Sequence, residues 1–377
     1  MNRHLVFAWR AAIVVLVLSP GWALPGWSAQ ASDPATRTVL LRPAPGPSLR
    51  IDFNYNFRNV LPPFEKEPAP EGKKTARGTI PTVPPTPFVR NITDEVLYLK
   101  VDHGNDFSEG SLVTYKSRYD GHVLFEGLQV TTERGSLVIP YTVHVYTYET
   151  GCAGWFLVAS GWEGELDLDG ETWTLGIVDN LDGRIDGSDL LYLRGPSKLM
   201  PVCPAPETLF FAGRTFRLDL AFKSVDAEVI LEAALTEFHP ERGELNVEAD
   251  GSRHLRLRSD RLTALLDDPA GTISLPVGTY RVEDCILGDE RIRWAGPKFV
   301  EYGRSLSIQS GKTASVHLGK PLSNTVEVSR DRNLLRLSYQ LVGAGGERYT
   351  YYNWRDYPSF TIYKGPLRIA RGTFPFG

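Results

Sequence analysis

Residues 334–341 have the sequence Leu-Leu-Arg-Leu-Ser-Tyr-Gln-Leu, in which apolar and polar side chains alternate. The odd-numbered positions from 335 to 341 are apolar, and the even-numbered positions between them are polar. Successive side chains of a β-strand point to opposite faces of the sheet. The alternation therefore predicts a strand with one face in a core and the other face in water.

Short runs rich in Val, Leu, Tyr, Thr and Trp recur from Glu95 onward, separated by turn residues. The chain contains 35 Gly and 27 Pro, which supply the turns that such a fold needs. We predict an all-β protein with antiparallel sheets in two or three β-sandwich-like domains. The runs predicted as strands are Val96–Val101, Ser136–Tyr148, Thr172–Val178, Leu190–Leu193, Thr215–Phe222, Gly278–Val282, Ser305–Ile308, Thr313–Leu318, Leu334–Leu341 and Ser359–Tyr363.

Residues 226–238 (DAEVILEAALTEF) are the strongest helical window. Val229, Ile230, Ala233 and Leu235 suit a helix face, and Asp226 suits an N-cap. The alternative is strand structure with the Glu side chains outward. We favour strand, because β-like runs flank the window on both sides.

Proline-rich stretches suggest the domain limits, because proline lacks a backbone donor and resists regular pairing. They lie at residues 62–90 and 197–207, and a further break is suggested at 319–322. The predicted organisation is a leader at 1–31, an extended Pro-rich segment at 32–94, a β domain with an acidic-turn hairpin at 95–198, a β-sandwich at 207–320 and a small immunoglobulin-like or sandwich portion at 321–377.

The first residues have the pattern of a secretory signal. Arg3, His4 and Arg10 form a basic region before the short apolar run Ala11–Leu18, and Ala29-Gln30-Ala31 matches a signal-peptidase site. We predict cleavage after Ala31 and a periplasmic or secreted protein; an uncleaved anchor is the alternative. No later apolar run reaches the roughly 20 residues of a membrane span.

Charge argues weakly against some partners. The chain has 41 Lys and Arg against 45 Asp and Glu, a net charge of −4. Nucleic acid and anionic membranes both favour clustered basic residues. We therefore expect no nucleic-acid partner, and the charge argues weakly against an anionic membrane as a partner.

Three cysteines, Cys152, Cys203 and Cys285, follow the leader. An oxidising compartment permits a disulfide, and Cys152 and Cys203 flank one predicted domain. They are the expected pair, with Cys285 left over. The alternative is that all three are small buried apolar residues.

An acidic segment follows a predicted strand that ends at Val178, in the sequence DNLDGRIDGSD. With Gly183 at the sixth position of a calcium loop, the oxygen-bearing residues Asn180, Asp182, Asp186 and Asp189 fall at positions three, five, nine and twelve. Val178 at position one cannot bind calcium. The segment therefore predicts either a Ca²⁺ site formed by these four residues or a hairpin turn held by Asx hydrogen bonds.

Aromatic residues cluster near the end of the chain, in the sequence YTYYNWRDYP. Exposed aromatic rows stack on sugar rings or anchor a protein partner. The alternative is that alternate residues fill a core. The residues predicted to bind a glycan or an envelope protein are Tyr349, Tyr351, Tyr352, Trp354 and Tyr357.

Three segments carry a resemblance to known proteins. DNLDGRIDGSDLLYL, its lead-in GSLVIPYTVHVY and SGWEGELDLDGETWTLGIVD, and LPVGTYRVEDCIL resemble uncharacterised exported bacterial proteins of the planctomycete type. Leu275–Val282 is also similar to a strand of carboxypeptidase-regulatory or prealbumin-like sandwiches. The resemblance implies a fold and a compartment, and no reaction.

Sequence motifs of catalysis are missing. The chain has no H-E-x-x-H, G-x-S-x-G or phosphate-loop motif. We therefore expect a non-catalytic exported protein that binds a partner or has a structural role at the cell envelope. The alternative is a carbohydrate-active or peptide-cleaving enzyme on an all-β scaffold, for which Glu163 and Asp167 beside Trp162 are the candidate carboxylates.

Overall fold

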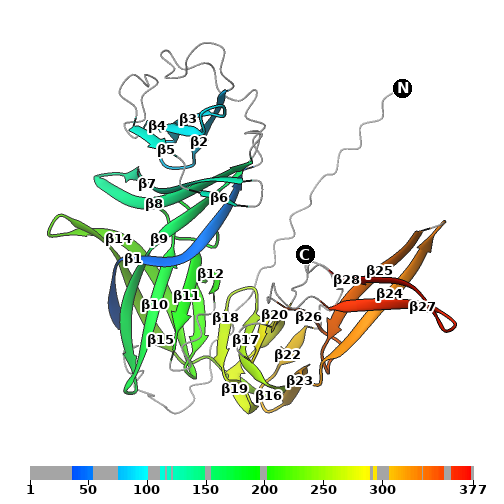
Figure 1. The fold of residues 1–377 in the computed structure, drawn as a ribbon. Helices are drawn as coiled ribbons and strands as arrows, with labels where there is room; N and C mark the ends of the chain where they lie inside the picture. The colour runs from blue at the N-terminus through cyan, green and yellow to red at the C-terminus, as the bar shows by residue number, and fades with distance from the viewer. Residues whose placement is uncertain are drawn as a thin grey trace, which may run out of the picture. The chain divides into compact units, whose positions relative to one another are not determined.

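In the computed structural model of the chain, every regular element of the described residues is a β-strand (Figure 1). The described residues are 36–53, 75–100, 111–114, 117–119, 122–148, 154–195, 202–288, 292–294, 305–332, 334–351 and 358–374. The predicted all-β class is confirmed, and each run predicted as a strand coincides with one. No helix in the described part of the chain is long and apolar enough to cross a membrane. The predicted leader, 1–31, lies outside the described residues.

The first large sheet is antiparallel and is organised around the long strand β9. Along one edge β9 pairs with β1, and along the other it pairs first with β8 and then with β10. The sheet continues outward through β7 and β6 on one side and through β11 and β12 on the other. Its strands are β1 (Thr36–Phe53), β6 (Ser117–Tyr119), β7 (His122–Arg134), β8 (Leu137–Tyr148), β9 (Gly154–Leu168), β10 (Glu171–Val178), β11 (Leu190–Arg194) and β12 (Val202–Pro204).

Strand β1 changes partner along its length. Residues 36–41 pair with β15, and residues 42–53 pair with β9, with a register shift between Pro45 and Leu49. One strand therefore belongs to two sheets, as at the corners of orthogonally packed β-structures. The predicted extended segment at 32–94 thus contains a strand that pairs with residues far along the chain.

The second large sheet runs from β1 through β15, β14 and β13 to β18, β17 and β20. The β13–β18 pairing is parallel, and it joins the strands that precede residue 240 to the strands that follow it. Its further strands are β13 (Thr208–Phe211), β14 (Arg214–Val225), β15 (Glu228–Phe238), β17 (Ser252–Arg258), β18 (Thr263–Asp267), β20 (Gly278–Leu287), β21 (Ile292–Trp294), β22 (Leu306–Ile308), β24 (Ser323–Asp331), β25 (Leu334–Val342) and β26 (Arg348–Tyr351).

Three smaller sheets complete the described structure. The predicted limit between residues 94 and 95 falls inside one of them, because β3 pairs with β4 across it. The first is β2 (Thr75–Ile80), β3 (Thr86–Asn91), β4 (Val96–Leu99) and β5 (Ser111–Thr114); the second is β19 (Gly271–Pro276), β16 (Arg242–Asp250) and β23 (Thr313–Gly319); the third is β27 (Ser359–Lys364) and β28 (Leu367–Thr373).

The buried apolar side chains form two cores. One core takes most of its residues from the strands between β1 and β15, with Trp162, Tyr141 and Phe156 among its large side chains. The other takes most of its residues from the strands between β16 and β26, and Tyr280 and Leu255 are buried in it. Two separate cores are consistent with more than one β-sandwich-like domain, since each pair of packed layers encloses its own core.

Two local predictions have different outcomes. Residues 228–238 form strand β15, as we favoured over a helix, and Ala233 and Leu235 are fully buried on one face of it. The prediction that β25 has one face in a core is wrong for its outer end, because Leu335 is 49% exposed. Its partner β24 is exposed at every position, so no layer covers this outer part of the hairpin within the described residues.

Candidate functional site

The acidic turn between β10 and β11 is organised around two buried carboxylates. Asp179 directly follows β10 and Asp189 directly precedes β11, and both are fully buried. Oδ1 of Asp179 accepts hydrogen bonds from the backbone N–H groups of Leu181 (2.7 Å) and Asp182 (3.1 Å). Asp189 accepts from the N–H of Asn180 at Oδ1 (2.8 Å) and from that of Asp186 at Oδ2 (2.6 Å). Each carboxylate thus satisfies backbone donors of the turn that surrounds it.

Burial changes the acidity of this turn. Desolvation, together with the charge of Asp189, raises the pKa of Asp179 to about 7. Desolvation likewise raises the pKa of Asp189 to about 6. The exposed Asp186 differs, since hydrogen bonds from Ser188 hold the pKa of its carboxyl below the ordinary value. Two of the carboxylates in one turn therefore change protonation near neutral pH.

The four residues predicted to bind calcium lie in this turn, and each has a hydrogen-bond partner within it. Asn180 donates to Ser188 Oγ (2.5 Å), and Asp182 accepts from the N–H of Arg184 (2.7 Å). Asp186 accepts from Ser188, and Asp189 accepts backbone donors as described above. Within the described ranges no group of three or more His, Cys, Asp or Glu is arranged to hold a metal ion. Asx hydrogen bonds account for the turn, and the calcium site stays a prediction.

The predicted aromatic row is divided by the fold. Tyr349 in β26 is buried in the second core, and its hydroxyl donates to Glu347 Oε1 (2.8 Å). Tyr349 is therefore a core residue, because its side chain faces inward from the strand. The prediction that it binds a ligand is corrected. Tyr351 ends the same strand, and its side chain is outside the description. Tyr352, Trp354 and Tyr357 lie outside the described residues, so their role stays a prediction.

The cysteines behave as small buried side chains where they are described. Cys203 is buried in the first core, and burial raises the pKa of its thiol to about 12. Cys285 is a buried free thiol in the second core. Cys152 lies outside the described residues, so its predicted pairing with Cys203 stays a prediction.

Glu163 and Asp167 do not form a catalytic pair. They lie four residues apart on β9, which separates them by about 13 Å along a strand, whereas glycosidase carboxylates lie roughly 5–9.5 Å apart. Glu163 accepts a hydrogen bond from the Tyr192 hydroxyl (2.9 Å), and Asp167 accepts one from the N–H of Gly170 (3.1 Å). Both carboxylates therefore stabilise local structure.

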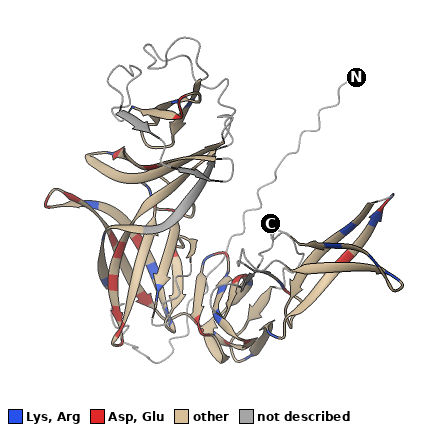
Figure 2. Cartoon of the chain, viewed as in Figure 1, with Lys and Arg blue, Asp and Glu red and all other residues tan. Residues whose placement is uncertain are grey.

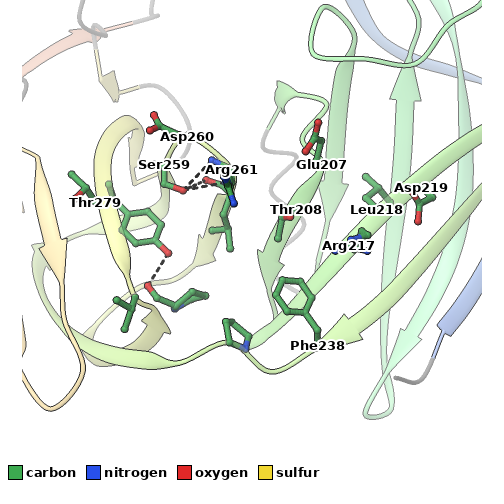
Figure 3. Close-up of a pocket in the computed structure, with 15 residues that line it drawn as sticks. Glu207, Thr208, Arg217, Leu218, Asp219, Phe238, Ser259, Asp260, Arg261 and Thr279 are labelled. Atoms are coloured by element: carbon green, nitrogen blue, oxygen red, sulfur yellow. Dashed lines mark hydrogen bonds between the residues drawn. The ribbon is translucent and has the colours of Figure 1, made fainter. Parts of the chain in front are cut away.

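A groove of about 1030 Å³ lies between the β13–β15 strands and the loops around β17–β20. Figure 3 shows Asp260, Ser259 and Thr279 on one side of it and Glu207, Arg217 and Asp219 on the other. Its size is at the upper end of the roughly 300–1,000 Å³ of ligand pockets. The groove is a concave site in the described part of the chain, and several polar groups line it.

The parallel β13–β18 pairing fixes the two sides of the groove relative to each other. Leu209 pairs with Thr263 and Phe210 with Ala264, while the N–H of Leu218 donates to the carbonyl of Glu207 (2.9 Å). Buried side chains form the apolar part of the lining. They are Leu218, Leu262, Pro276 and Tyr280. Backbone pairing and an apolar lining thus build the groove before any ligand enters.

Charged side chains of both signs line the groove without internal partners. For none of these five does the described structure contain a side-chain hydrogen bond or ion pair. They are Glu207, Arg217, Asp219, Asp260 and Arg261. Phe238, at the end of β15, adds an aromatic ring that is 36% exposed. The groove therefore offers hydrogen-bond donors, acceptors and an apolar ring to a ligand.

Sequence reasoning did not find these residues. Glu207 belongs to a stretch that the sequence marked as a domain boundary, and Asp260 and Arg261 lie in a short loop without any motif. They meet only because strands β13 and β18, more than 50 residues apart, lie side by side.

Comparison with protein-family models, with curated proteins and with solved structures gives no match. The resemblance to exported planctomycete-type proteins and to prealbumin-like sandwiches therefore stays a prediction.

Proposed function

We propose that the protein is an exported, non-catalytic binding protein and that its groove binds a carbohydrate chain. The observation that carries the proposal is the set of free charged side chains around an apolar lining, with Phe238 at its edge. A sugar presents hydroxyl groups that donate and accept hydrogen bonds, and an apolar ring face that packs on an aromatic side chain. The carboxylates of the groove can accept a hydrogen bond from a sugar hydroxyl, and its guanidinium groups can donate one to it.

The balance of charge favours a neutral or mixed ligand over a polyanion. Two Arg and three Asp or Glu line the groove. A binding site for a highly anionic polymer would carry an excess of Lys and Arg. Neutral oligosaccharides and amino-sugar polymers therefore fit the lining better than sulfated or phosphorylated ones.

The test is a binding screen against immobilised neutral, amino-sugar and acidic oligosaccharides, followed by calorimetry with the best binder. We expect Phe238→Ala and Arg217→Ala each to weaken binding at least tenfold. Tyr148→Ala is a matched control, because this aromatic residue is 44% exposed on β8 and does not line the groove.

The same screen separates binding from hydrolysis. New reducing ends after prolonged incubation would support the alternative of a carbohydrate-active enzyme. Absence of binding to the whole panel, or equal binding by the Phe238→Ala and Tyr148→Ala variants, would contradict the carbohydrate proposal.

A further inference from the structure

Large apolar side chains are exposed most strongly on the two C-terminal hairpins, β24–β25 and β27–β28. Seven of the fourteen exposed large apolar residues in the described structure belong to them. Four of the seven exceed 60% exposure, and none of the other exposed apolar residues does. The seven are Val326, Val328, Leu334, Leu335, Tyr363, Leu367 and Ile369. Such concentration on a small part of a surface marks an interaction site.

The most exposed of these side chains lie beside the hairpin turns. Leu334 and Leu335 begin β25 directly after the first turn, and Val328 lies on β24 shortly before it. Tyr363 and Leu367 flank the second turn, where Gly365 adopts a positive φ. Both hairpins therefore present apolar residues at their tips.

The same hairpins are basic, whereas the remainder of the chain is acidic. Six Lys or Arg and only two acidic residues, Glu327 and Asp331, lie within their limits. The rest of the chain keeps 35 Lys and Arg against 43 Asp and Glu. Figure 2 shows Lys and Arg along both hairpins. The six basic residues are Arg330, Arg332, Arg336, Lys364, Arg368 and Arg371.

A stack of aromatic rings joins the two hairpins away from their turns. Phe374 lies against Tyr339 of β25, with ring centroids 5.4 Å apart, and against Phe360 of β27, at 4.8 Å. Tyr339 also donates to Asn324 on the paired strand (2.5 Å). The two hairpins are thus held together as one element, which we call the C-terminal arm (residues 323–342 and 359–374).

We propose that the tips of the C-terminal arm insert into the interface of an anionic lipid bilayer. Aliphatic and Tyr side chains partition into the headgroup region, and neighbouring Lys and Arg bind acidic headgroups while their stems lie along apolar surface. The acidic remainder of the chain is repelled by the same surface. Charge therefore selects the arm as the part that makes contact.

The distribution of the apolar residues favours a bilayer over a protein partner. A stable protein interface needs one packed patch of about 800 Å² on each partner. Here the apolar residues are divided between two narrow hairpins, and β24 is exposed at all nine positions on both of its faces. A bilayer interface is continuous and accepts separate tips, so it suits this arrangement.

The experiment is co-sedimentation of the full chain with vesicles of phosphatidylcholine alone and of phosphatidylcholine with phosphatidylglycerol (3:1). We expect binding to the anionic vesicles only, and a loss of at least tenfold in partition coefficient for Leu334→Ser/Leu335→Ser and for Arg332→Glu/Arg368→Glu. Raising the salt to about 0.5 M should weaken binding, because it screens charges beyond a few ångströms.

Matched controls keep the test specific. Val138→Ser removes an apolar side chain that is 54% exposed on β8, and Lys312→Glu reverses an exposed charge outside the arm. Both should bind vesicles as the unaltered protein does. All variants change exposed residues and should keep the same circular-dichroism spectrum.

Three results would overturn the proposal. The unaltered protein does not sediment with anionic vesicles; the arm variants sediment as well as the controls; or the arm variants lose only a concentration-dependent self-association in ultracentrifugation. The last would assign the arm to contacts between copies of the chain. Each result is independent of sugar binding, which the groove variants measure.

Discussion

The hydroxyl of Tyr141 donates a hydrogen bond of 2.8 Å to Oδ2 of Asp179, and both side chains are buried. The bond links the middle of β8 to the turn after β10, which are 38 residues apart in sequence. The other oxygen of Asp179 accepts backbone donors of its own turn. One carboxylate thus ties the acidic turn to the first core.

Tyr141→Phe should lower the free energy of unfolding by about 1–3 kcal/mol, because it leaves a buried acceptor without its partner. Urea denaturation at pH 8 measures the change. Tyr148→Phe is the control, since the Tyr148 ring is 44% exposed, and it should have an effect below about 0.5 kcal/mol. Equal stability of the two variants would contradict the assigned role of Tyr141.

The stabilisation that Asp179 and Asp189 contribute should fall as the pH rises through the range 4 to 7. The pKa of Asp179 is about 7 and that of Asp189 about 6 in the folded protein, against an ordinary value of 3.8. The folded state therefore holds protons that the unfolded chain has released. The stabilisation from these two carboxyl groups is complete below pH 4 and is lost as the pH passes their folded pKa values. Each unit by which a folded pKa exceeds the ordinary value contributes at most roughly 1.4 kcal/mol to the free energy of unfolding.

Asp179→Asn should remove part of this pH dependence. The amide keeps a hydrogen-bonding oxygen and carries no charge, so the variant gains stability at pH 8 relative to pH 5 when compared with the unaltered protein. Urea denaturation of both proteins at the two pH values measures the difference. Parallel pH profiles would show that Asp179 is already ionised in the folded protein at pH 5.

Gly176 should be sensitive to any side chain. A Cβ atom there would lie 2.0 Å from the Cζ atom of Tyr192, the residue opposite it on β11. Gly176→Ala must displace a buried ring whose hydroxyl binds Glu163, and we expect a loss of about 1–3 kcal/mol by thermal or urea unfolding. Gly187→Ala meets open space and should be close to neutral.

The calcium prediction has a direct test in titration calorimetry. Binding would require Asp182 and Asp186 to turn from backbone donors toward an ion. If the site exists, calcium gives heat with the unaltered protein and none with Asp182→Ala. Absence of heat with the unaltered protein would decide for a turn held by hydrogen bonds alone.

Local periodicity was sufficient to predict the strands but not their burial. The alternation in β25 is real, yet Leu335 is half exposed because no second layer covers that hairpin in the described structure. Burial depends on what packs against a strand, which a sequence of eight residues does not contain. The residues 228–238 show the opposite case, since neighbouring strands decided between helix and strand.

Pairings between distant segments were beyond prediction. The groove depends on the parallel pairing of β13 with β18, and no pattern in the sequence predicts that these strands lie together. Net charge also concealed a local difference, because the chain as a whole is mildly acidic while the C-terminal arm is basic. The net charge of the whole chain therefore argued weakly against an anionic membrane, which is the partner that we propose for the basic arm.

The change of partner along β1 has a consequence for how the chain acquires its structure. Thr36 and Thr236, 200 residues apart, lie side by side. Strand β1 therefore cannot pair with β15 until more than half of the chain has been synthesised. Until then its hydrogen-bonding edge is open to intermolecular association. Such non-local closure slows folding, and a holding factor that shields newly made chain would raise the yield of native protein.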